Sequence, residues 1–223
     1  MCYDDGTCNG PGERKMENRK FDEVRLDAFE AGIELHKIRK LAMVFPGIGY
    51  RTDKPLLYYA SRLATAHGYA LREVHYRGFP DEVNKRDASG RKELVELAME
   101  QTRELWNGVQ ASAVEEILFI SKSIGTAVAC AYASEIGRPV RHILFTPLEE
   151  TAFQGVRDAL VFHGTADHYA RTEVLRRHCE ENRLQPVIFE DANHSLETGD
   201  VRRDIVTLSE VMKRVDAFMS TDT

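Results

Sequence analysis

The hydrophobic positions of this chain follow two different periods along most of its length. Short continuous apolar runs, such as residues 41–45 (LAMVF) and 117–120 (ILFI), are typical of strands that are covered on both faces of a sheet. Between them, apolar residues recur every three or four positions, as in residues 56–63, which indicates helices. The two kinds of segment alternate, and this alternation predicts an α/β fold whose mostly parallel central sheet carries helices on both faces.

The pattern locates the individual elements. A hairpin is predicted first, with strands at 24–28 and from Ile33 onward, followed by strands at 41–45, 71–74, 116–120, 143–145, 159–162 and 187–189. Helices are predicted around 56–67, 94–106, 126–136, 171–182 and 200–219. The last helix places one apolar stripe along its length, formed by Val201, Ile205, Leu208, Met212, Val215 and Met219.

Length and composition fit one domain without a membrane segment. The 223 residues are 43% apolar and 30% charged, as is usual for a globular protein. Residues 1–20 are polar and contain glycine, so we expect a mobile tail there and a single domain over 21–220. No apolar run reaches the roughly 18 residues that span a bilayer, and the start of the chain does not resemble a secretory signal, so the prediction is a cytoplasmic protein that does not bind membranes. A formal net charge of −6 argues against nucleic-acid binding.

The cysteines and histidines do not form a pattern typical of a metal site. Cys130 and Cys179 fall on predicted helix faces, where buried reduced thiols are expected, and Cys2 and Cys8 lie in the tail. Two histidines flank Asp167, but the sequence has no His-Glu-x-x-His helix and no carboxylate cluster. We therefore predict no metal and no cofactor.

The corner SKSIG at residues 121–125 connects a buried strand to a helix that is rich in alanine. Its hydroxyls either cap the helix or include a nucleophile held at the edge of the sheet. Ligands of parallel α/β sheets bind at the carboxyl ends of the strands. Ser123, Asp167 and His194 each follow a predicted strand, in that chain order.

These residue types fit nucleophilic catalysis. A serine hydroxyl needs a base to react at neutral pH, and His194 could accept its proton while Asp167 orients the imidazole. The backbone N–H of Ile124, at a helix N-terminus, could face a developing oxyanion. A second donor could come from Ile48, on the PGIGY loop at residues 46–50.

Together these segments resemble the α/β-hydrolases. Residues 121–125 match the nucleophile elbow of that family, residues 163–167 (HGTAD) its acid segment, and Asn193-His194 its histidine loop, while the loop at 46–49 stands where the family usually has HGxxG. The resemblance covers residues 21–220, and it implies an eight-stranded sheet, or a slightly trimmed one, and metal-free hydrolysis through an acyl-enzyme. In two places the chain departs from the pattern. Ser121 replaces the first glycine of the elbow, and Pro46 replaces the histidine before the oxyanion loop that carries the Ile48 donor.

Several alternatives stay open at this point. Ser121 could be the nucleophile, although Gly125 would then be out of register. Lys122 could form a Ser–Lys dyad, but a neighbour on a tight corner points away from Ser123, so a solvated or salt-bridged lysine is expected. Asp191 and Asp158 are candidate replacements for the acid.

The length of one loop bears on the substrate. Residues 146–157 are too few for the cap domain that many relatives insert there, so we predict a lidless, open site for a small acyl ester or thioester. This lidless architecture resembles that of dienelactone-hydrolase-like proteins, although those use cysteine at the nucleophile position, where this chain has Ser123. Loop residues Tyr50, Arg51, Glu149 and Tyr169 are candidates to line it. Acyl transfer would use the same residues, a catalytically silent binding module is the alternative, and the sequence leaves a homodimer open.

Overall fold

We describe the fold from a computed structural model of the 223-residue chain, which describes residues 38–78, 88–106 and 113–221. The predicted N-terminal hairpin, the predicted tail, Cys2 and Cys8 all lie outside the described residues. The predictions about them, and the boundary of the domain at residue 21, therefore remain predictions.

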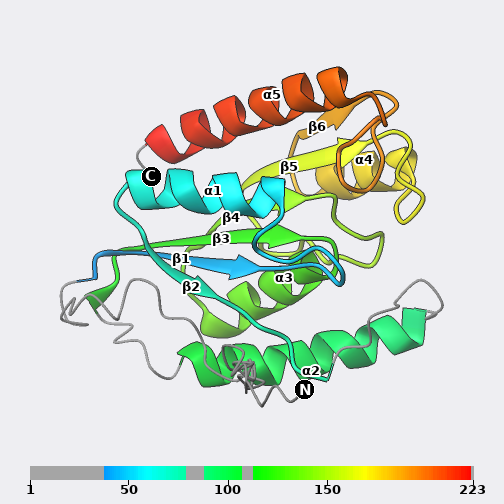
Figure 1. The fold of residues 1–223 in the computed structure, drawn as a ribbon. Helices are drawn as coiled ribbons and strands as arrows, with labels where there is room; N and C mark the ends of the chain where they lie inside the picture. Colours follow the sequence, from blue (N-terminus) through cyan, green and yellow to red (C-terminus); the bar gives the residue numbers. More distant parts are fainter. Residues whose placement is uncertain (1–37, 79–87, 107–112, 222–223) are drawn as a thin grey trace, which may run out of the picture.

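Strands and helices alternate along the described chain, as the hydrophobic pattern predicts (Figure 1). The strands are β1 (Lys40–Phe45), β2 (Ala70–Glu73), β3 (Glu116–Lys122), β4 (Arg141–Phe145), β5 (Asp158–Gly164) and β6 (Pro186–Phe189). The helices are α1 (Pro55–Ala66), α2 (Ala88–Trp106), α3 (Ile124–Ile136), α4 (Thr172–Glu181) and α5 (Val201–Ser220).

The strands pair in the order β2-β1-β3-β4-β5-β6, and every pairing between these described strands is parallel. The chain leaves β1 toward β2 on one side and later returns to β3 on the other, so the strand order reverses at β1. In a parallel sheet, this reversal opens a crevice at the carboxyl ends of the strands, where ligands bind. Figure 1 shows the arrowheads of β1, β3 and β5 directed toward the same side of the molecule.

Alternation along β3 separates two apolar layers. Leu118 and Ile120 pack with residues of α1 and α5 on one face, whereas Ile117 and Phe119 pack with α2 and α3 on the other. Helix α4 joins α3 on the second face, where Leu175 packs in a cluster with residues of β4 and β5. The prediction of helices on both faces is therefore confirmed.

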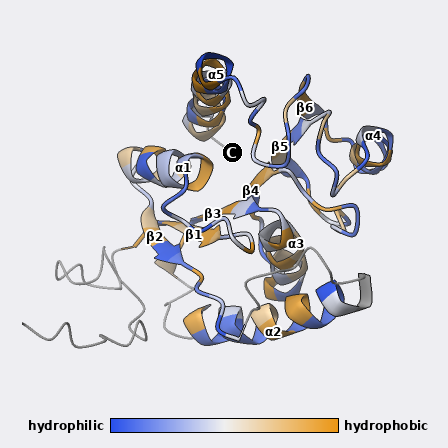
Figure 2. Cartoon of the chain, turned by 45° about the vertical axis from the view of Figure 1, so that its right-hand side comes forward, coloured by the Kyte–Doolittle hydropathy of each residue, from blue (hydrophilic) through white to orange (hydrophobic). Residues whose placement is uncertain are grey.

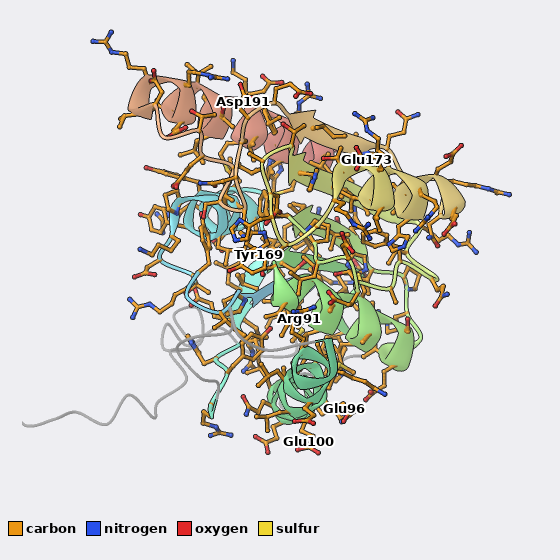
Figure 3. The ribbon with its side chains drawn as sticks, turned by 90° about the vertical axis from the view of Figure 1, so that its right-hand side faces the viewer. Arg91, Glu96, Glu100, Tyr169, Glu173 and Asp191 are labelled. Carbon is orange, nitrogen blue, oxygen red and sulfur yellow. The ribbon has the colours of Figure 1, made fainter. Side chains whose placement is uncertain are left out.

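Helix α2 forms an outer layer against α3. Its buried residues Leu94, Ala98 and Met99 face inward, and Figure 2 shows apolar and polar positions mixed along this helix. Glu96 and Glu100 lie on its outer side (Figure 3). The amphipathic pattern of the segment thus reflects one buried face and one solvated face.

The apolar stripe predicted along α5 is only partly buried. Val211, Val215 and Met219 lie in the core, but Val201 is 71% exposed and Ile205 is 62% exposed. The first turns of the helix border a surface hollow beside α1, instead of packing on the sheet. Periodicity predicts which residues share a helix face, but it does not predict how far along the helix that face is covered.

The segment between β4 and β5 forms no helix or strand, which confirms the prediction that no cap domain is inserted there. Cys130 and Cys179 are buried free thiols, as expected. None of the described helices combines the length and the apolar composition that crossing a bilayer requires.

Candidate active site

Ser123 lies on a strained corner between β3 and α3. Its φ of 56° and ψ of −125° fall in a region that residues other than glycine rarely adopt. The surrounding backbone holds this conformation, because the Ser123 N–H donates to the Phe145 carbonyl at 3.0 Å and Thr126 N–H donates to the Ser123 carbonyl at 2.9 Å. Ser123 occupies the N-cap position of α3, but its side chain makes no capping hydrogen bond. Its hydroxyl is therefore free to interact elsewhere.

Hydrogen bonds join Ser123, His194 and Asp167 into one chain. The Ser123 Oγ lies 2.8 Å from the His194 Nε2, and the His194 Nδ1 lies 2.7 Å from the Asp167 Oδ2. The Asp167 side chain is fully buried, whereas the imidazole is 17% exposed. The structure thus brings together the three residues that the sequence proposes from three separate strand ends.

Asp167 is fixed from several directions at the end of β5. Its Oδ1 accepts the backbone N–H of Tyr169 at 2.9 Å, and the preceding Ala166 N–H donates to the Ala192 carbonyl at 2.9 Å. Burial raises the pKa of this carboxyl, but the hydrogen bond and the charge of His194, with the Tyr169 N–H, together hold that pKa below its ordinary value. Asp167 is consequently an anion that orients the imidazole.

The loop that carries His194 is held by one of its own side chains and by a side chain from the segment after β4. Asn193 Oδ1 accepts the backbone N–H of Ser195 at 2.7 Å, and Thr146 Oγ1 donates to the His194 carbonyl at 2.9 Å. The Tyr169 ring packs against the imidazole with centroids 4.6 Å apart. The imidazole is therefore positioned both by hydrogen bonds and by packing.

The environment keeps His194 in its neutral form. Burial, and next the positive charge of Lys122, lower the pKa of His194 to about 4, against the opposing effect of Asp167. A neutral imidazole can accept a proton, so the group is ready to act as a base throughout the range from about pH 5 upward.

A histidine NMR titration checks this state. The imidazole signals of His194, assigned by their loss in His194→Gln, are expected to stay at neutral positions from pH 7 to pH 5 and to shift only as the pH approaches about 4. A midpoint near the ordinary value of about 6.5 would contradict the stated effect of burial.

The loop after β1 brings backbone donors next to Ser123. Gly47 and Tyr50 pair through two backbone hydrogen bonds of 3.0 and 3.3 Å, which closes a tight turn around Ile48. A Cβ on Gly47 would lie 3.1 Å from the Ser123 Cβ, so the turn approaches the corner closely. Within the described residues, the amides of Ile48 and Ile124 donate no hydrogen bond. Both therefore remain available to an oxygen atom at this place.

The cleft around these groups has a volume of about 290 Å³. Tyr50 and Tyr169 line it, as predicted, together with Ile48, Gly49, Lys122, Ser123, His168, Asn193, His194 and Ser195. The structure places Arg51 and Glu149 elsewhere. Arg51 forms an exposed ion pair with Asp53 at 2.6 Å, and Glu149 accepts hydrogen bonds from Arg171.

A second hollow, of about 270 Å³, adjoins the cleft between α1 and α5. It shares Tyr50 and Ser195 with the cleft, and its walls are largely apolar, with Leu56, Ile205 and Leu208 among them. The exposed first turns of α5 therefore border the site.

The alternative residues lie in other surroundings. Ser121 is fully buried, and its hydroxyl donates to the Ile143 carbonyl at 3.2 Å, inside the sheet. Asp158 pairs with Arg141 at the start of β5, and Asp191 is 75% exposed beside Arg203. Figure 3 shows Asp191 near α5, well separated from Tyr169 in the cleft.

Lys122 differs most from its prediction. The expectation of a solvated or salt-bridged side chain is wrong, because this lysine is only 1% exposed and forms no ion pair among the described residues. Its ammonium lies 5.0 Å from the centre of the Tyr50 ring. The signal was present in the sequence, since alternation along β3 puts Lys122 on the same covered face as Leu118 and Ile120.

The described residues contain no group of three or more metal-binding side chains, so the structure offers no residues that would hold a metal ion there. His163, which precedes the acid, is buried on β5, and its Nε2 lies 3.0 Å from the Thr172 Oγ1. This contact anchors β5 to the start of α4.

Sequence reasoning missed some residues that shape the cleft. His168 and Ser195 line it, and Thr146, which adopts a positive φ of 42°, anchors the His194 loop. None of them belongs to a motif, so only their positions next to predicted strand ends could have suggested them.

Comparison with solved structures identifies the fold. The chain is similar to the Pyrococcus furiosus esterase Pf2001, with a TM-score of 0.59 and 15% identity over 82% of this chain and 83% of that one. It is similar to a serine hydrolase without a lid from Xanthomonas campestris, with a TM-score of 0.60 and 16% identity over 83% and 85%. An α/β serine hydrolase homologue from Coxiella burnetii gives a TM-score of 0.59 and 13% identity over 81% and 86%. No protein-family model and no curated protein matches the sequence.

The chain therefore has the α/β-hydrolase fold, and a lidless serine hydrolase is among its structural neighbours. This confirms the resemblance read from residues 46–49, 121–125, 163–167 and 193–194 as far as the fold is concerned. The described residues form six strands of the sheet, and the two further strands predicted near the N-terminus lie outside the described residues.

Proposed function

We propose that this protein is a serine hydrolase that cleaves a small ester or thioester through an acyl-enzyme on Ser123. The observation that carries the proposal is the unbroken hydrogen-bonded chain from the Ser123 hydroxyl through His194 to the buried Asp167. The strained corner at Ser123 supports it, since strain of this kind concentrates at functional sites.

In the first half of the reaction, His194 accepts the hydroxyl proton on Nε2 while the Ser123 Oγ attacks the carbonyl carbon of the substrate. Asp167, hydrogen-bonded to Nδ1, stabilises the imidazolium that forms. The carbonyl oxygen becomes an oxyanion that accepts hydrogen bonds from the backbone N–H groups of Ile48 and Ile124. When the tetrahedral intermediate collapses, the imidazolium gives its proton to the leaving alcohol or thiol.

The second half repeats these steps with water. His194 removes a proton from a water molecule that attacks the acyl-enzyme, and collapse of the second intermediate returns the proton to Ser123 and releases the carboxylic acid. The same residues would transfer the acyl group if another nucleophile replaced the water.

The size and openness of the cleft support a small substrate. A volume of about 290 Å³ lies at the lower end of the range for small-molecule sites, and the described segment between β4 and β5 contains no cap domain. The adjoining apolar hollow beside Leu56 gives room for a short aliphatic part of the substrate.

Labelling with a fluorophosphonate probe tests this proposal. The expected result is a single adduct on Ser123, found by intact mass and peptide mapping, that disappears in Ser123→Ala and weakens in His194→Ala. Ser195→Ala removes another serine of the same cleft and is the matched control, in which the adduct on Ser123 should persist. Absence of any adduct on the folded protein between pH 6 and 9 would reject the proposal and favour a catalytically silent binding module.

A further inference from the structure

The mechanism proposed above leaves one buried charged group of the cleft unused. Lys122 ends β3 and immediately precedes Ser123, and both residues line the same cleft. Of the described residues that line this cleft, Lys122 is the one lysine or arginine. Only 1% of its surface is exposed, so its side chain is almost fully covered by the protein.

The ammonium of Lys122 has no hydrogen-bond acceptor or ion-pair partner among the described residues. Within the described part of the chain, the contact recorded for the ammonium is with the Tyr50 ring, whose centre lies 5.0 Å away. A buried ammonium is costly unless an anion pairs with it or it loses its proton. Because Lys122 is one of the residues that line the cleft, an anion bound in the cleft is a candidate partner for this ammonium.

Two carboxylates from two different segments act on Lys122. Asp167 lies at the end of β5 and is already engaged by His194, while Glu197 is exposed on the loop that follows His194. Both carboxylates attract the ammonium over a distance longer than an ion pair, and His194 experiences the positive charge in return. The phenol of Tyr50 accepts the backbone N–H of Leu56 and is not directed at Lys122 as an acceptor.

From this arrangement we propose that Lys122 pairs with a carboxylate carried by the acyl part of the substrate, so that the preferred substrates are half-esters or half-thioesters of dicarboxylic acids. The inference rests on the function proposed above. The leaving alcohol departs after the first half of the reaction, whereas the acyl part stays attached to Ser123, the residue that follows Lys122 and lines the same cleft. A carboxylate there completes the coordination that the protein leaves unsatisfied.

Paired substrates test the proposal. The para-nitrophenyl half-esters of adipic, pimelic and suberic acid are compared with the same esters whose far carboxylate is capped as a methyl ester, and nitrophenol release is measured. For at least one chain length, wild-type kcat/KM is expected to be about tenfold or more higher for the free carboxylate. A ratio near one at all three lengths overturns the inference.

Lys122→Met keeps the length and the apolar stem of the side chain but removes its charge. In this variant, the ratio of kcat/KM between the free-carboxylate and capped esters is expected to fall to about one, even if the rates for both esters change. Arg51→Met is the matched control, because it removes an exposed cation next to the cleft that is paired with Asp53. This variant should keep the wild-type ratio, and an equal loss in both variants would indicate only long-range attraction and reject the pairing.

The pH dependence of the substrate preference is measured on the wild-type protein, so it tests the proposal even if Lys122→Met does not fold. Burial lowers the pKa of Lys122 to about 7. The lysine pairs with a carboxylate only when the lysine is protonated. The ratio of kcat/KM for the free-carboxylate ester to that for the capped ester is therefore expected to be at its maximum below pH 6 and to decline by up to tenfold per pH unit above pH 7. The kcat/KM for the capped esters should show no such decline. If Lys122 acts only on His194, both esters change together with pH, and the proposal is wrong.

The probe labelling separates the two levels of failure. An adduct on Ser123 together with a flat substrate preference would reject the role of Lys122 and leave the hydrolase proposal intact. Absence of the adduct would reject the hydrolase proposal itself.

Discussion

Asp167→Asn is expected to lower kcat by about 10⁴-fold while the protein stays folded, which is the size of effect that this change has in serine protease triads. The carboxylate accepts a hydrogen bond from the His194 Nδ1 at 2.7 Å and so requires the proton on that nitrogen, leaving Nε2 free to face Ser123 at 2.8 Å. An asparagine amide can donate to Nδ1 instead, which places the imidazole proton on Nε2. The base would then be in the wrong tautomer.

Steady-state hydrolysis of a para-nitrophenyl ester, with the thermal unfolding midpoint measured in parallel, checks this expectation. Asp191→Asn is the matched control, because Asp191 also follows a strand shortly before His194 but is exposed and pairs with Arg203. Its kcat should stay within about twofold of the wild-type value, in line with the small energies of exposed ion pairs. Comparable losses in both variants would show that Asp167 has no special role.

Gly125→Ala is expected to destabilise the protein by about 4 kcal/mol or more, which would lower the unfolding midpoint by about 10 °C. A Cβ at this position would lie 2.3 Å from the Phe45 carbonyl oxygen and 2.5 Å from that of Pro46. Both obstacles are backbone atoms at the end of the central strand β1, so no side chain can move to make room. If the variant folds, the loop bearing Ile48 must shift away from Ser123, and ester hydrolysis should fall as well.

Gly137→Asn, at the other end of α3, is the control. Gly137 has a φ of 61°, and a Cβ there would contact nothing within 4 Å. Asparagine adopts this left-handed conformation readily, so a loss of no more than about 1 kcal/mol is expected from differential scanning calorimetry. If Gly125→Ala lowered the free energy of unfolding as little as Gly137→Asn, α3 and β1 would not approach each other as closely as the structure shows.

The sequence predicted the described elements because their signals are local. The apolar run at 41–45 and the amphipathic period at 56–63 depend only on neighbouring residues, and both became the expected elements β1 and α1. The candidate residues Ser123, Asp167 and His194 followed from one further rule, that parallel strands present their carboxyl ends at one edge. This rule predicts proximity and does not predict hydrogen bonds.

One prediction failed where burial depends on distant segments. Lys122 was expected to be solvated or salt-bridged, but Tyr50, far away in sequence, covers it on the side of the sheet that α1 and α5 occupy. On α5, periodicity placed Val201 and Ile205 on the apolar stripe without predicting their burial, and both lie where no other described element covers them. Periodicity specifies a face, and only the neighbours of that face decide its exposure.

By itself, the sequence determined the alternation of strands and helices, the absence of an inserted cap after β4 and the identity of the polar residues at three strand ends, because each depends on spacing along the chain. The tertiary structure alone decided that Asp167 and not Asp191 reaches His194, and that Ser121 is buried within the sheet while Ser123 lines the cleft. It also decided that Lys122 is buried beside the cleft, with no ion-pair partner among the residues that the structure describes. These outcomes depend on distances between segments that are far apart in sequence, and such distances are fixed only when the sheet and its helices pack together.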